Sequence, residues 1–80
     1  MKNAADLAQD CKRIEKALLL SGEKEAAEKL ENIRLAGSTG GEIVMGMRFI
    51  AKQLLKSETL EKHISASLHQ LIDDINKTGW

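Results

Sequence analysis

The side chains best suited to acid–base or metal chemistry in this chain are two histidines and one cysteine. His63 and His69 are six residues apart, a spacing that puts them on different sides of a helix, so they cannot share a metal ion unaided. His69 and Asp73 are one turn apart, which is more often typical of a surface pair than of an oriented base. Cys11 has no histidine near it in sequence and falls on an apolar stripe, which favours a small buried side chain over a nucleophile. We therefore expect no enzymatic activity, no cofactor and no metal site.

The glycine-dense stretch AGSTGGEI, residues 36–43, could cradle an anion or could simply separate two helices. Free amides and the helix dipole at a helix N-terminus attract negative charge. The stretch lacks the lysine and adjacent hydroxyl of a phosphate-binding loop, and Glu42 places a carboxylate where a phosphate would sit. Gly37 suits the end of one helix, and Thr39 with Glu42 matches a capping box at the start of the next. The sequence favours the cap and leaves an anion or small-ligand site as an alternative.

Length and composition indicate one small helical domain that spans residues 1–80. The 80 residues include no proline, and alanine, leucine, glutamate and lysine are abundant. A chain of this length assembles only a small core, and a single cysteine cannot form an internal disulfide, so self-association is the remaining common source of stability. With no signal peptide and no apolar run long enough to span a membrane, we expect a cytoplasmic protein.

Helical periodicity predicts an all-α fold, a small antiparallel bundle of about four helices. Asn3 is the expected cap of the first helix and Gly22 its expected end, with Gly79 as the closing glycine of the last and Trp80 packed back on Ile75. Whether the third and fourth helices are separate is open, because an apolar heptad register continues through both; we favour a break near Ser57. The predicted helices are 3–20, 23–35, 41–56 and a fourth that starts near Ser57 and carries Leu60, Ile64, Leu68, Leu71, Ile72 and Ile75.

The predicted third helix has more apolar surface than one core needs. Its core arc consists of Ile43, Val44, Met47, Ile50, Ala51, Leu54 and Leu55. Met45 and Phe49 lie outside this arc, one turn apart, beside a basic stripe of Arg48, Lys52 and Lys56. Two explanations are open: another helix of the same chain covers this pair, or a second protein chain does. Gly46, in the middle of the helix, suggests a close approach of another backbone.

These patterns predict a non-enzymatic protein-interaction module, of the adaptor, immunity-protein, antitoxin or inhibitor type. We expect its partner-binding residues to be Met45, Arg48, Phe49 and Lys52, because aromatic, methionine and arginine side chains are enriched in interfaces. The expected partner is another protein, the chain itself as a homodimer, or both. A nucleic-acid binder that uses the basic stripe is the alternative; 12 basic and 12 acidic residues leave no surplus positive charge for it.

Overall fold

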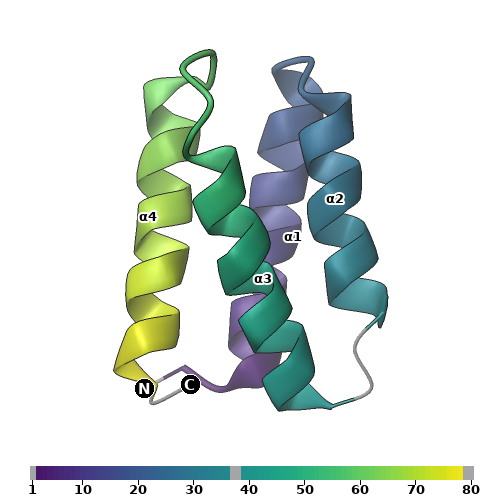
Figure 1. The fold of residues 1–80 in the computed structure, drawn as a ribbon, viewed down its shortest axis with the longest axis vertical. Helices are drawn as coiled ribbons and strands as arrows, with labels where there is room; N and C mark the ends of the chain where they lie inside the picture. Colours follow the sequence, from purple (N-terminus) through teal and green to yellow (C-terminus); the bar gives the residue numbers. More distant parts are fainter. Residues whose placement is uncertain (1, 37–38, 79–80) are drawn as a thin grey trace.

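The computed structural model describes residues 2–36 and 39–78, and these form four helices with no strand among them. The helices are α1 (Ala4–Leu20), α2 (Lys24–Ala36), α3 (Gly40–Leu54) and α4 (Lys62–Lys77). They run alternately up and down and pack as an antiparallel bundle, so that the first and last described residues lie at the same end (Figure 1). The predicted all-α bundle of four helices is therefore confirmed.

The helix ends follow the predicted cap residues where the structure describes them. The Asn3 side chain accepts a hydrogen bond from the Asp6 backbone N–H, and the Asp6 carboxylate accepts one from the Asn3 N–H, which completes a capping box. Gly22 closes α1 in the left-handed region with φ of 83°, a conformation that glycine adopts without strain. The Thr39 side chain accepts a hydrogen bond from the Glu42 N–H at 3.2 Å, which is the threonine half of the predicted capping box. The contributions predicted for Gly37, Gly79 and Trp80 lie outside the described residues.

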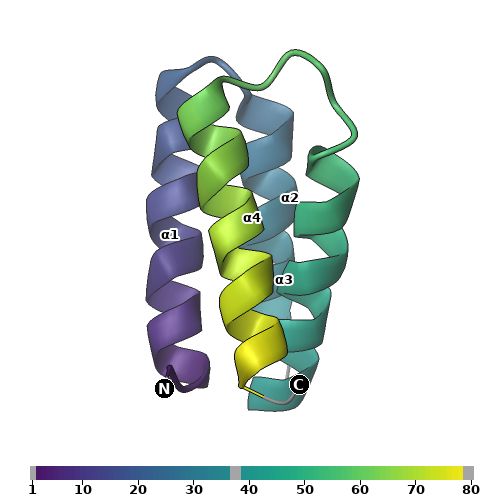
Figure 2. The ribbon, with the colours of Figure 1, turned by 90° about the vertical axis from the view of Figure 1, so that its left-hand side faces the viewer.

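The predicted break between the third and fourth helices is confirmed, but the predicted start of α4 is wrong. A seven-residue connection, residues 55–61, separates Leu54 from Lys62, so one continuous helix is excluded (Figure 2). Ser57 does not cap α4: its hydroxyl lies 2.8 Å from the Thr59 hydroxyl and accepts from the Thr59 N–H, which folds it into a local turn. The helix instead begins after Glu61, which makes no side-chain cap bond.

The arrangement of the four helices leaves one side of α3 without a covering helix. Each helix contacts its two neighbours around the bundle, and α1 also contacts α3 across the centre, whereas α2 and α4 do not touch within the described residues. In Figure 1, α3 lies nearest the viewer with α1 behind it.

The buried apolar side chains are Leu7, Cys11, Ile14, Leu18, Ala26, Ala27, Leu30, Val44, Met47, Ile50, Ala51, Leu54, Ile64, Leu68, Leu71 and Ile75. They include five of the seven residues of the predicted α3 arc, and the other two, Ile43 and Leu55, pack against this core.

Gly46 lies where α3 packs directly against Ile33 of α2. A β-carbon placed on Gly46 would lie 2.5 Å from Cγ2 of Ile33. The sequence suggested a close backbone approach, and the structure shows instead a side chain of the same chain filling the space that glycine leaves. Gly46 thus serves the internal core and does not face a second chain.

Candidate functional site

The outward face of α3 carries the two apolar side chains that the sequence singled out. The exposed fraction of Met45 is 56% and that of Phe49 is 60%. The possibility that another helix of this chain covers them is therefore wrong, because α4 packs on a different side of α3. At about 100° per residue, these side chains point roughly opposite to the buried arc of Val44, Met47 and Ile50. We call Met45, Phe49 and the exposed Lys52 the outward α3 face.

The basic residues predicted beside this face divide into two groups. Arg48 is half-buried at the boundary with α4, where its guanidinium donates to the Asn76 side-chain oxygen at 3.0 Å. Lys52 and Lys56 are exposed and form no ion pair with any residue in 2–36 or 39–78. Lys56 lies just beyond the C-terminus of α3. The cations available to a ligand on this face are thus Lys52 and Lys56, while Arg48 borders it.

Within residues 2–36 and 39–78, three other large apolar side chains are exposed, and none repeats this arrangement. Leu19 and Leu20 are consecutive residues at the end of α1, so their side chains diverge by about 100°. Leu35 lies near the end of α2. Met45 and Phe49 differ in being one turn apart within a helix, so their side chains form one continuous patch. This continuity distinguishes the outward α3 face from scattered surface leucines.

A partly buried ion pair, which no pattern in the sequence identified, joins α1 to α2. The Arg34 guanidinium donates twice to the Glu15 carboxylate, from Nε at 2.9 Å and from Nη2 at 3.0 Å. The side chain of Glu15 is 8% exposed and that of Arg34 is 14% exposed. Burial, together with a hydrogen bond from the thiol to Glu15, raises the pKa of Cys11 well above its ordinary value. The predicted burial of Cys11 is confirmed, and its thiol is held in the protonated, unreactive form.

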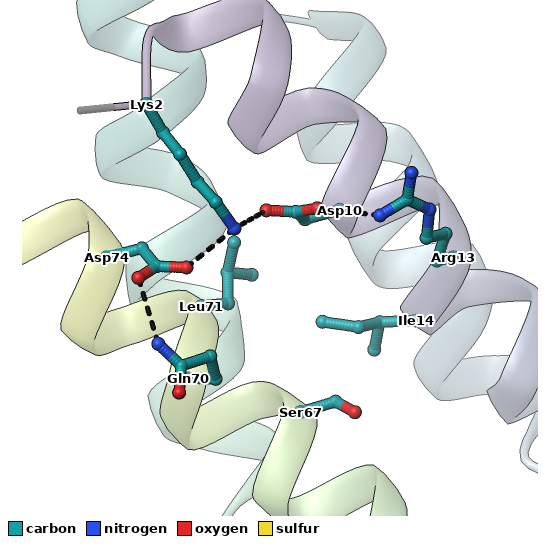
Figure 3. Close-up of a pocket in the computed structure, with 8 residues that line it drawn as sticks. All are labelled: Lys2, Asp10, Arg13, Ile14, Ser67, Gln70, Leu71 and Asp74. Atoms are coloured by element: carbon teal, nitrogen blue, oxygen red, sulfur yellow. Dashed lines mark hydrogen bonds and ion pairs between the residues drawn. The ribbon is translucent and has the colours of Figure 1, made fainter.

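A cleft of about 210 Å³ lies between α1 and α4, and its charged groups bind one another (Figure 3). The Lys2 ammonium bridges the carboxylates of Asp10 and Asp74. Arg13 also contacts Asp10, and the Gln70 amide donates to Asp74. Because these charges are already paired, the Lys2 bridge acts as a clasp that ties the chain just before Asn3 and α1 to the last turns of α4. Residues 72 positions apart in sequence form it, so no local pattern could reveal it.

The histidines and the glycine-dense stretch, which were the other candidates from the sequence, do not come together in one site. His63 contacts Glu61 at 3.2 Å, and Asp73 pairs with Lys77 at 2.9 Å, so the spacing of His69 and Asp73 is not used for a pair. Among residues 2–36 and 39–78, no group of three or more histidine, cysteine or carboxylate side chains is arranged to hold a metal ion. The glycine-dense stretch contributes the Thr39 cap, and Gly37 and Ser38 lie outside the described residues.

Comparison with protein-family models, with curated proteins and with solved structures gives no match. None of the four described helices is both long and apolar enough to cross a membrane. The outward α3 face is the strongest functional feature of the described surface.

Proposed function

We propose that this chain is a small, non-enzymatic interaction module that binds another protein chain through the outward α3 face. One observation carries the proposal: Met45 and Phe49 remain more than half exposed on a helix whose opposite side is fully used by the core. Exposing a contiguous methionine–phenylalanine pair has no benefit for a free monomer, whereas such pairs are favoured contacts in interfaces.

The charges around the pair support a protein ligand over a nucleic acid. Lys52 and Lys56 supply two available cations, Arg48 is engaged by Asn76, and the chain as a whole has zero net charge. Phosphate binding depends on many neutralising contacts, so two lysines beside an apolar patch favour a mixed apolar and acidic protein surface. Adaptors, immunity proteins, antitoxins and inhibitors all act through contacts of this kind, and the module belongs functionally with them.

Immobilised wild-type protein, Phe49→Glu and Leu20→Glu provide the test. Leu20 is the matched control, because it is 82% exposed and lies on α1, away from the proposed face. Each variant is first shown to be folded by circular dichroism and is then used to capture partners from an extract of the native host. We expect wild type and Leu20→Glu to retain a partner that Phe49→Glu does not retain. The same partner, once purified, should bind wild type and Leu20→Glu more tightly than it binds Phe49→Glu. Equal retention by Phe49→Glu and wild type would refute the proposed face.

A further inference from the structure

We infer that the outward α3 face binds the same face of a second copy of this chain, with the two α3 helices antiparallel. The inference rests on the proposed function, which it deepens by naming the occupant. It is carried by the order of four exposed side chains along α3: Glu42, Met45, Phe49 and Lys52.

These four residues form a single seam. Their spacings are three, four and three residues, which is the alternation that a helix shows to a partner helix in a coiled coil. At about 100° per residue they cover an arc of about 80°, roughly opposite to the buried arc of α3. All four are exposed, so a second helix can reach the seam without any rearrangement of the bundle. In Figure 1, α3 is the helix nearest the viewer, and no other helix lies in front of it.

The seam is complementary to itself in only one direction. In a twofold dimer, residue i of one copy contacts residue j of the other, and j contacts i. Met47 lies midway between Met45 and Phe49 and also midway between Glu42 and Lys52. An antiparallel pairing centred at Met47 therefore sets Met45 against Phe49 and, in the same register, Glu42 against Lys52. A parallel pairing would instead set Lys52 against Lys52 and Glu42 against Glu42, which is repulsive.

Two features of the monomer are compatible with this contact. Lys52 forms no ion pair within the described residues, so its ammonium group is available to the second copy. A carboxylate offers about four acceptor positions, so Glu42 can receive that ammonium group while keeping bonds within its own chain. Two apolar pairs and two ion pairs result, and each apolar pair lies nearer the twofold axis than the charges do. This is the arrangement of an apolar centre with a charged rim.

The expected dimer is weak. A helix of 15 residues is about 22 Å long, so one helix pair buries less than the roughly 800 Å² per partner of a standard interface. We expect a dissociation constant between about 10 µM and about 1 mM, which requires measurements over a wide range of protein concentration.

Sedimentation equilibrium on the full chain tests the inference with five proteins: wild type, Phe49→Glu, Glu42→Lys, Lys52→Glu and the double charge reversal. We expect wild type to dimerise and Phe49→Glu to weaken the dimer by at least about 100-fold, because the new carboxylate meets an apolar side chain. Each single charge reversal should weaken it about 3- to 10-fold, and the double reversal should return it to within about 3-fold of wild type. Circular dichroism controls for folding, since both reversals oppose the helix dipole.

The other outcomes separate the two proposals. A wild-type protein that stays monomeric at millimolar concentration would overturn the second copy as occupant, while a partner captured through Phe49 would leave the proposed function standing. A dimer in which the double reversal fails to restore affinity would overturn the antiparallel register. A dimer that Phe49→Glu does not weaken would overturn this inference, and the capture experiment with Phe49→Glu would then decide the proposed function separately.

Discussion

Gly46→Ala should destabilise the protein even though alanine is the better helix former. Replacing a mid-helix glycine by alanine ordinarily stabilises by about 1 kcal/mol. Here the new β-carbon would lie 2.5 Å from Cγ2 of Ile33, whereas two carbon atoms in contact prefer about 3.5–4.0 Å. The missing distance of about 1 Å or more must come from Ile33 or from a separation of α2 and α3.

The side chain of Ile33 cannot easily provide this distance. Cγ2 is attached directly to a branched β-carbon, and about nine in ten isoleucines in helices occupy one χ1 rotamer. Overpacking of this kind costs about 1–3 kcal/mol, which outweighs the gain in helix propensity. We expect Gly46→Ala to lower the free energy of unfolding by about 1 kcal/mol, which corresponds to a decrease of about 4–8 °C in melting temperature for a domain of this size.

A double-mutant cycle isolates the contact. Ile33→Ala removes Cγ2, so Gly46→Ala in that background should stabilise by about 0.5–1 kcal/mol, a reversal of sign. Urea denaturation followed by circular dichroism measures all four free energies of unfolding. A stabilising effect of Gly46→Ala in the wild-type background would contradict the close packing of α3 against Ile33.

Three further predictions concern stability. Arg34→Met should lower the free energy of unfolding, measured by urea denaturation, by about 3 kcal/mol, because it leaves the Glu15 carboxylate buried without its ion pair. Changing both residues to methionine should bring this free energy within about 1 kcal/mol of the wild-type value. An Arg34→Met variant as stable as wild type would contradict the role of the ion pair. The hydrogen bond from Lys2 lowers the pKa of Asp74, so this carboxyl stabilises the fold above its unfolded pKa and ceases to do so as the pH falls through its folded pKa. Thermal melts should therefore show a loss of stability below about pH 4 that is smaller in Asp74→Asn; equal pH profiles would count against the clasp. Thr39→Ala should lower the free energy of unfolding by about 1 kcal/mol and leave association with another chain unchanged. A variant that keeps full stability but loses binding would instead indicate a ligand site at the glycine-dense stretch.

The parts of the fold that were predicted depend on neighbours in sequence. The period of the apolar residues determines which side of each helix is buried, and cap residues act within a single turn, as Asn3 does with Asp6. The start of α4 was placed five residues too early because Ser57 has two local options. A serine hydroxyl can cap a helix or close a turn, and here it bonds to Thr59.

The parts that were missed depend on which helices meet. Glu15 sits among buried residues one turn after Cys11, which indicates a charge that needs a partner, but only the packing of α1 on α2 identifies Arg34. The bridge from Lys2 to Asp74 likewise could not be predicted without the finding that α1 and α4 are neighbours. The exposure of Phe49 was undecided for the same reason, since it depends on which side of α3 the fourth helix occupies.

The most direct test of the outward α3 face uses the fact that Phe49 is the single phenylalanine of the chain. Incorporation of 4-fluorophenylalanine gives one fluorine resonance that reports on this position alone. We expect its chemical shift to change with protein concentration or on addition of a captured partner, and its sensitivity to exchange of H2O for D2O to fall as the ring leaves water. Leu20→Glu should show the same behaviour, because that residue lies off the face. A fluorine atom whose resonance shows full water accessibility at every protein concentration and with every partner bound would contradict the role of Phe49 in a contact with another chain.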